Sequence, residues 1–194
     1  MSKTIEKNAA EQFMAGVSPK DSNIEFIGVK STKTVLWLQN GKTKYFKDLP
    51  PHLFELLQNS FLKDPQAMND LQNVETMERK VELYTYYMYG DLDSIPDISK
   101  GRLSPSENFR DNKNCISQHW ASKEITIDGV RMNNRDITIL DSISQDFPDK
   151  AIANILGISM STFNWHKQNL LHKTNCATKV ALAIKAQNQK VLVA

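Results

Sequence analysis

Two helical patterns that meet at a single glycine constrain this chain more than any other feature. They lie in "DKAIANILGISMSTFNWHKQNLLHK", which runs from Asp149 to Lys173. Apolar residues recur at helical spacing before Gly157, and glycine readily adopts the left-handed conformation in which helices commonly end. Ser159 is a good N-cap for a second helix, with Phe163 and Leu170 on its inner face. The stretch therefore predicts two short helices joined by a tight turn.

The outer face of the second helix indicates what it contacts. Asn164, Trp165, Lys167 and Gln168 point away from the apolar face. An α-helix fits the major groove of DNA, where Asn and Gln suit adenine, while the preceding helix braces against the phosphate backbone. A helix-glycine-helix pattern also occurs where helices only pack together, so both interpretations stay open at this point.

The distribution of charge favours an anionic partner for the C-terminal part. Residues 130–194 carry eight Lys/Arg against four Asp/Glu, whereas residues 1–129 carry 16 against 18. Such an asymmetry favours a bound polyanion, although this excess is modest for a nucleic-acid binder. With 40% hydrophobic and 24% charged residues, the chain is expected to fold around a packed core.

The N-terminal part shows a different organisation. Alternating residues flank Asn40-Gly41 in "KTVLWLQNGKTKYF", and this pair predicts a type I′ hairpin because both central residues need positive φ. Helical spacing follows "LPP" and returns over about Val74–Tyr89, whose aromatic stripe is expected to be core. The predicted fold class is α+β: a flexible or loosely helical arm over 1–20, a small α+β domain over 21–127 with an irregular lobe at about 90–123, and a helical domain over 128–194.

No pattern in the chain points to catalysis or to a cofactor. Cys115 and His119 have C-x3-H spacing, but a structural zinc needs four ligands and no second pair lies nearby. The acidic residues Asp91, Asp93 and Asp97 lack EF-hand spacing and are interpreted as solvated loop carboxylates. Glycine-rich phosphate loops and Gly-x-Ser-x-Gly elbows do not occur. We therefore expect no enzyme activity, catalytic residue, metal or cofactor.

Cysteine usage and hydropathy predict a cytoplasmic protein. Cys115 and Cys176 are far apart, which fits free thiols in a reducing compartment. The sequence contains no apolar run of about 18 residues and no apolar signal segment at its start. No membrane partner is expected.

The C-terminal segment resembles a known family. The stretch "MNNRDITILDSISQDFPDKAIANILGISMSTFNWHKQNLLHKTNCATKVALAIKA" resembles the LuxR-type helix-turn-helix domain of bacterial transcription regulators, without gaps. "RDITIL" is similar to the opening of that family's first helix, "PDKAIANILGIS" to its scaffold helix and turn, "MSTFNWHKQNLLHK" to its recognition helix, and "TNCATKVALAIKA" to its fourth helix. The resemblance implies a four-helix domain that binds duplex DNA, often as a dimer. The preceding "ENFRDNKNC" is more weakly similar to uncharacterised proteins of Bacteroidetes and their phages, a resemblance that names no ligand.

Carried over by position, the resemblance implies a recognition helix over about Ser161–Lys173. The predicted DNA-binding residues are Lys150, Ser161, Thr162, Asn164, Trp165, Lys167, Gln168 and Lys173. Lys150 and Lys173 are the expected phosphate contacts. Trp165 stands where a small polar residue is usual, and it either packs internally or lies against a sugar or thymine methyl. Asn175 replaces the glycine that normally gives the left-handed turn, which Asn tolerates.

Double-stranded DNA is thus the predicted partner, and a transcriptional regulator the predicted function. Two such domains held one DNA turn apart read a palindrome, so we also expect a homodimer. The predicted dimer residues of the last helix are Val180, Ala181, Ile184 and Lys185; alternatively, Val180 and Ile184 only close the domain's own core. The N-terminal domain would supply dimerisation, a sensor, or a surface for RNA polymerase or another protein partner. The alternative function is a protein interaction module whose degenerate helix-turn-helix does not bind DNA.

Overall fold

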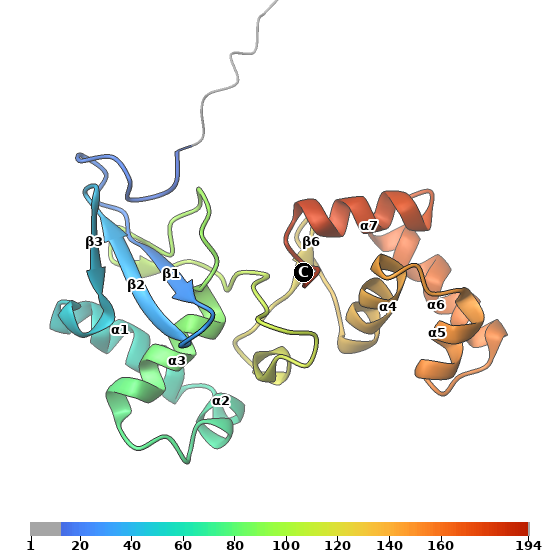
Figure 1. Ribbon diagram of the computed structural model, residues 1–194, viewed down its shortest axis with the longest axis horizontal. Coiled ribbons are helices and arrows are strands. Elements are labelled where there is room, and N and C mark those ends of the chain that lie inside the picture. Colours follow the sequence, from blue (N-terminus) through green and yellow to red (C-terminus); the bar gives the residue numbers. More distant parts are fainter. Residues whose placement is uncertain (1–12, 194) are drawn as a thin grey trace, which may run out of the picture.

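A computed structural model describes residues 13–193 and shows two lobes joined by an irregular segment (Figure 1). Two separate clusters of buried hydrophobic side chains form the cores of these lobes. Most of the arm expected over 1–20 lies outside the described residues. Residues 13–20 form turns, and Ala15 is buried with its N–H donating to the Asp93 carbonyl at 3.2 Å.

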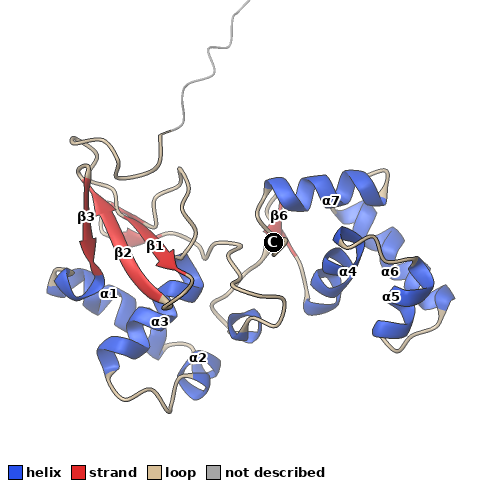
Figure 2. Cartoon of the chain, in the orientation of Figure 1, coloured by secondary structure: helices blue, strands red, loops and turns tan. Residues whose placement is uncertain are grey.

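The N-terminal lobe is built on a three-stranded antiparallel sheet in the order β1-β2-β3 (Figure 2). The strands are β1 (Glu25–Val29), β2 (Thr34–Gln39) and β3 (Lys42–Tyr45). Phe26 pairs with Trp37, and both side chains are buried. Asn40 and Gly41, at φ 52° and 71°, join β2 to β3, which confirms the predicted hairpin and its turn chemistry.

Three helices complete this lobe: α1 (Pro51–Leu62), α2 (Pro65–Asp70) and α3 (Met77–Tyr89). The third packs against β1 and β2, and α1 packs against α3. The helix predicted from about Val74 begins instead at Met77, because the Thr76 side chain caps it by accepting from the Arg79 N–H. Its tyrosines are buried as expected, and the Tyr84 ring stacks on Trp120 with centroids 5.6 Å apart.

The segment between the lobes is irregular, as its composition predicted. It holds only the short strands β4 (Ile98–Ser99) and β5 (Arg102–Leu103) and a 3₁₀ turn at Ile116–His119. Ile98 forms a bridge with Ile24, so β4 is tied to the segment that leads into β1.

The C-terminal lobe contains a two-stranded hairpin and four helices. The strands are β6 (Thr126–Ile127) and β7 (Val130–Arg131), followed by α4 (Asn134–Ser144), α5 (Asp149–Ile155), α6 (Met160–Lys173) and α7 (Lys179–Asn188). The four-helix arrangement was expected. The second core cluster begins at Ile125, before the predicted boundary at 128, because Ile125 and Ile127 pack against the helices.

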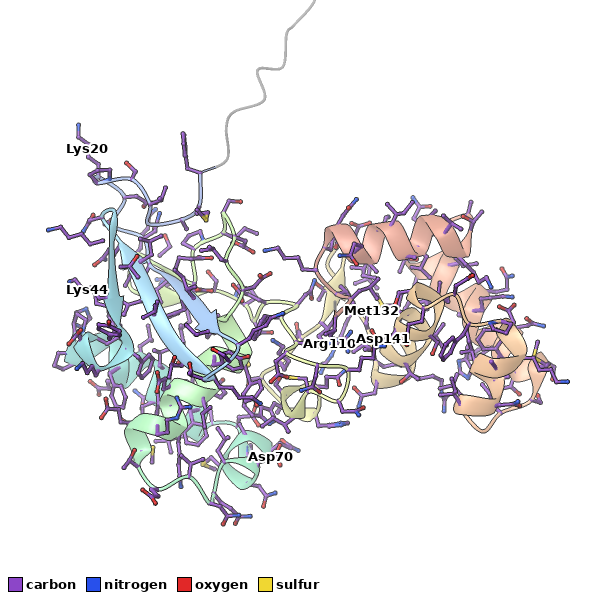
Figure 3. All side chains as sticks on the ribbon, in the orientation of Figure 1. Lys20, Lys44, Asp70, Arg110, Met132 and Asp141 are labelled. Atoms are coloured by element: carbon purple, nitrogen blue, oxygen red, sulfur yellow. The ribbon has the colours of Figure 1, made fainter. Side chains whose placement is uncertain are left out.

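A buried ion pair joins the irregular segment to the C-terminal lobe (Figure 3). The Arg110 guanidinium donates to both carboxylate oxygens of Asp141, from Nη1 at 3.0 Å and from Nη2 at 2.7 Å, and Nη2 also donates to the Val191 carbonyl at 2.7 Å. Nearby, the Asn108 amide donates to the carbonyls of Thr126 and Gln189. These contacts hold the connecting segment against α4 and the end of α7.

Candidate DNA interface

The turn between α5 and α6 fixes the angle at which α6 is presented. Gly157 adopts φ +64°; its N–H donates to the Asn154 carbonyl at 3.1 Å, and the Ile158 N–H donates to the Ala153 carbonyl at 3.0 Å. This bond pair is the Schellman motif, which satisfies the last carbonyls of α5. Ser159 then caps α6 by accepting from the Thr162 N–H at 3.1 Å. Both predicted signals therefore act as expected.

The C-terminal end of α6 has the same pair of hydrogen bonds, but asparagine rather than glycine occupies the left-handed position. Asn175 has φ +51°; its N–H donates to the His172 carbonyl, and the Cys176 N–H donates to the Leu171 carbonyl at 2.9 Å. Asparagine is one of the few residues that visits the left-handed region readily. The expectation that Asn175 preserves the turn is thus confirmed.

The two faces of α6 differ sharply. Phe163 and Leu170 are fully buried, whereas Asn164 and Gln168 are exposed. Trp165 is 61% exposed, and its ring meets the His166 ring edge-on at a centroid distance of 4.8 Å. The alternative in which Trp165 packs into a neighbouring helix or the N-terminal lobe therefore does not describe this structure. Ser161 and Thr162 are exposed at the N-terminal end of the same helix.

The lysines predicted to bind DNA lie in unequal surroundings. Lys150 is exposed. The Lys167 Nζ lies 2.5 Å from Asp149 Oδ2, and the Lys173 Nζ lies 2.5 Å from Asp136 Oδ2. Ion pairs to carboxylates in the same lobe reduce the positive charge that these two lysines present to a polyanion.

Asp149 and Arg135 are residues of this surface that the sequence pattern did not single out. Asp149 accepts from Lys167 and also from Lys179 at 2.7 Å. Partial burial raises its pKa, but the hydrogen bonds from the two lysines outweigh burial and leave the pKa below its usual value. The exposed Arg135 of α4 has its Nη1 3.0 Å from His166 Nε2, which places a further cation beside α6. Only the packing of the helices reveals both contacts.

The predicted dimer residues of α7 are mostly on the surface. Val180 is 68% exposed and Ile184 57% exposed, and Ala181 is exposed beside them. Leu182 and Ala186 on the opposite side close the core instead. Lys185 pairs with Asp128 at 2.6 Å and donates to the Thr174 carbonyl. The alternative in which Val180 and Ile184 close the domain's own core therefore does not hold.

Four short helices, with the second and third joined by a left-handed turn and a polar outer face on the third, define a helix-turn-helix domain. Residues 131–186 match the family model of bacterial regulatory proteins of the luxR family. The C-terminal lobe is thus a LuxR-family helix-turn-helix domain, and the match covers less than a third of the chain. No curated protein and no solved structure matches the chain significantly.

The length and apolar character of the helices bear on whether any of them could span a membrane. Over residues 13–193, no helix combines the length and the apolar character needed to cross a membrane.

Proposed function

We propose that this protein is a transcriptional regulator that binds duplex DNA with α6 in the major groove. The observation that carries the proposal is the exposed polar face of α6, held by a capped turn at each end. A helix fits the major groove, and its outward side chains in the first two turns reach base edges. Asn164 and Gln168 lie on this face and are suited to adenine.

Phosphate contacts would come from the edges of the same surface. Lys150 is exposed on α5, and Ser161 and Thr162 present hydroxyl groups at the N-terminus of α6, where free N–H groups favour an anion. Lys173 and Lys167 are assigned to the DNA as well, although each must share its charge with a carboxylate. Trp165 is assigned to an apolar contact with a sugar or a thymine methyl.

One observation favours a second candidate function, a protein interaction module that uses the same surface without binding DNA. Lys167, Lys173 and Lys179 are all paired with carboxylates of their own lobe. Phosphate neutralisation supplies much of the affinity of most DNA-binding proteins, so this pairing weakens the electrostatic attraction. The exposed Trp165 would then anchor a protein partner.

The salt dependence of binding distinguishes the two functions. Affinity for duplex DNA should fall steeply between about 50 and 200 mM salt, and replacing Lys150 or Lys173 by Ala should weaken binding to every sequence and reduce the salt slope by about one. Lys63→Ala, at an exposed position on the N-terminal lobe, is the control and should leave the slope unchanged. Fluorescence anisotropy measures all four proteins. Binding that is absent or insensitive to salt would favour the protein interaction module.

Base readout needs a separate experiment. Each good bidentate contact to adenine discriminates by about 1–3 kcal/mol, so Asn164→Ala and Gln168→Ala should lose sequence preference more than total affinity. Selection from random duplex DNA gives the preferred site of each protein, with Asn59→Ala on the exposed face of α1 as the control. If the wild type and both α6 variants select the same site, these residues do not read bases.

A further inference from the structure

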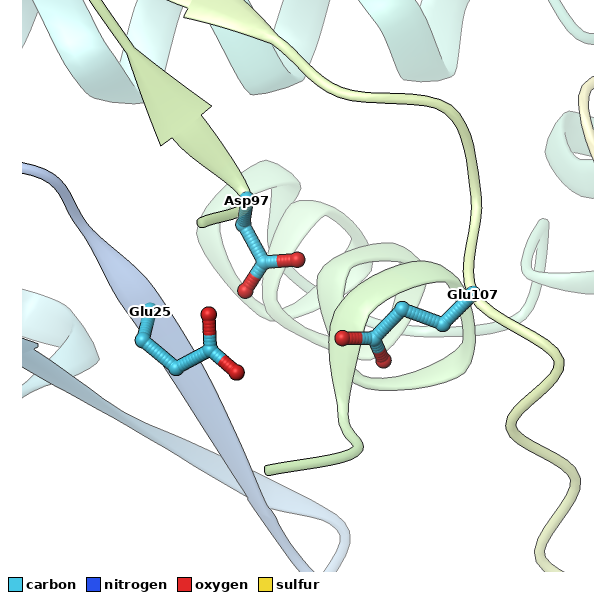
Figure 4. A group of neighbouring side chains, drawn as sticks. All are labelled: Glu25, Asp97 and Glu107. Atoms are coloured by element: carbon cyan, nitrogen blue, oxygen red, sulfur yellow. The ribbon is translucent and has the colours of Figure 1, made fainter. Parts of the chain in front are cut away.

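Three acidic side chains meet where the irregular segment packs against β1 of the N-terminal lobe (Figure 4). Glu25 lies in β1, Asp97 lies just before β4, and Glu107 lies after β5. One carboxylate oxygen from each residue lies within 4.8 Å of the other two. Glu25 and Asp97 are 0% and 1% exposed, and Glu107 is partly buried. The interpretation of Asp97 as a solvated loop carboxylate is therefore wrong, because this side chain is buried.

Backbone amides hold one oxygen of each carboxylate. Glu25 Oε1 accepts from the Asp93 N–H, Glu107 Oε2 from the Asp91 N–H, and Asp97 Oδ2 from the Phe26 N–H, each at 2.7 Å. These bonds orient the three groups toward one another, as Figure 4 shows. The arrangement thus comes from the backbone of the strands and loops around it.

Two of the remaining oxygens are buried and have no partner. Within residues 13–193, no N–H or hydroxyl donor lies within hydrogen-bonding distance of Glu25 Oε2 or Glu107 Oε1, and both atoms are shielded from solvent. Without a cation, Asp97 and Glu107 share a hydrogen bond in which one carboxyl group carries the proton. Leaving a buried acceptor unpaired is unfavourable, and more so for a charged group. Glu25 is fully buried and its carboxylate points at the other two, so an unpartnered oxygen faces into the cluster.

The electrostatics of the cluster favour a positively charged ligand, because burial holds the carboxyl groups protonated near neutral pH unless a cation stabilises their ionised forms. Burial raises the pKa of Glu25 to about 8 and that of Glu107 to about 9, and raises the pKa of Asp97 as well. Lys123, whose Nζ donates to the Tyr87 carbonyl at 2.6 Å, is the buried cation that acts on Glu107. One lysine against three carboxylates leaves an excess of two negative charges when all are ionised.

We propose that Glu25, Asp97 and Glu107 bind a divalent cation that prefers oxygen ligands, with Ca²⁺ the best match. All three donors are carboxylates, which suit hard cations rather than zinc. Calcium–oxygen bonds of about 2.3–2.6 Å place opposite ligands about 5 Å apart and neighbouring ligands closer. The observed spacing of the three oxygens fits this range. Magnesium more commonly uses one or two protein carboxylates and keeps several waters.

A pocket adjoins the cluster. It has a volume of about 590 Å³, and its lining includes Asp97, Glu107 and the residues Asn188, Gln189 and Lys190 at and after the end of α7. Lys190 and Asp91, which both line this pocket, form an ion pair at 2.8 Å. The cluster therefore lies next to the place where the N-terminal lobe meets the C-terminal lobe.

Calorimetry on the full chain tests the proposal without DNA. After treatment with EDTA and its removal, titration with CaCl₂ should show one bound equivalent, and MgCl₂ should bind more weakly. Calcium at about 100 times its Kd should raise the midpoint of thermal unfolding by about 5–10 °C. Glu25→Gln and Glu107→Gln should each abolish the heat and the shift, whereas Glu55→Gln, at an exposed position on α1, should retain both.

Two results would overturn the cation site. The first is a wild-type protein that gives no heat and no thermal shift with either cation, in which case the carboxyl groups hold protons instead. The second is binding that persists unchanged in the folded Glu25→Gln and Glu107→Gln proteins, which would place the ion elsewhere. Circular dichroism establishes that each variant is folded, and because Glu25→Gln and Glu107→Gln test the same site independently, either folded variant decides whether the ion binds there.

Discussion

Asp149 joins two helices through one side chain. It accepts from Lys167 of α6 and from Lys179 of α7, and its own backbone begins α5. A carboxylate in the first turn of a helix is also favoured by the helix dipole. This side chain therefore contributes to the placement of α6.

Acid titration should reveal the contribution of Asp149. Its folded-state pKa lies below the ordinary value of 3.8, so its stabilisation is present above that value and is lost as pH falls through the folded-state pKa. Asp149→Asn should lower the free energy of unfolding by about 0.5–1 kcal/mol at pH 7, the usual range for partly exposed pairs. Urea unfolding at pH 7 and at about pH 2 measures the difference, which should disappear in acid. A difference that is the same at both pH values would assign the effect to something other than charge.

The residues in the left-handed conformation that follow α5 and α6 determine the direction in which the chain enters and leaves α6. Gly157 and Asn175 have nearly the same conformation, at φ +64° and +51°. A side chain added at Gly157 would meet no atom within 4 Å, so a substitution there changes backbone strain and little else. The stability of a variant at position 157 therefore reports the backbone strain without a contribution from new side-chain contacts.

Replacing Gly157 with Ala should destabilise the protein by about 1–2 kcal/mol, the cost of the left-handed region for a residue with a Cβ. Gly157→Asn should cost less, because Asn tolerates this region and already occupies the equivalent position at the end of α6. Urea unfolding should show a lower midpoint for Ala at an unchanged m-value. Equal losses for Ala and Asn would show that packing, rather than φ, controls the site.

Local signals explain which elements the sequence could predict. Asn40-Gly41, Gly157 and Ser159 act through their own backbones or through residues a few positions away, so their roles are visible in the order of residues. The start of α3 was misplaced because a weak apolar pattern at Val74 precedes the capping residue Thr76. Short-range signals in the sequence therefore predicted the type of these elements better than the residues at which they begin or end.

Contacts between distant segments were not predictable in this way. Lys167 and Lys173 look like free cations in the sequence, yet each pairs with a carboxylate on another helix. Glu25, Asp97 and Glu107 are far apart in the chain; the bridge between Ile98 and Ile24 places Asp97 beside Glu25, and the Asp91 N–H holds Glu107 near them. The way in which elements pack decides these partners, and no spacing rule describes it. The structure shows where these side chains lie on the surface, and their contacts with DNA remain a prediction.

We propose that two copies of the chain associate through the exposed aliphatic side chains of α7. Val180 and Ile184 lie one helical turn apart on a face that includes Ala181. In a two-fold dimer the same patch meets itself, and small residues allow the two helices to approach closely. Two copies of α6 would then reach successive half-sites on one side of DNA.

Ile184→Glu should separate the two copies. A carboxylate at the centre of an apolar contact must be desolvated, so sedimentation velocity should show a dimer for the wild type and a monomer for the variant. Asn59→Glu on α1 introduces a like charge far from α7 and should remain dimeric. Lys185→Glu is a poorer choice because Lys185 already pairs with Asp128 within the chain. A wild type that stays monomeric with and without DNA would contradict the dimer.

The bidentate ion pair between Arg110 and Asp141 determines where a folded fragment that contains the C-terminal lobe can begin. A fragment that begins at the β6–β7 hairpin keeps Asp141 but loses its guanidinium, and removing one partner of a buried pair costs about 3–5 kcal/mol. It also loses the Asn108 amide that satisfies the carbonyls of Thr126 and Gln189. A fragment that starts before Asn108 keeps Arg110, which is the counter-charge of Asp141. Limited proteolysis that yields a stable helix-turn-helix piece should therefore cut before Asn108, so that Asn108 and Arg110 stay with the C-terminal lobe.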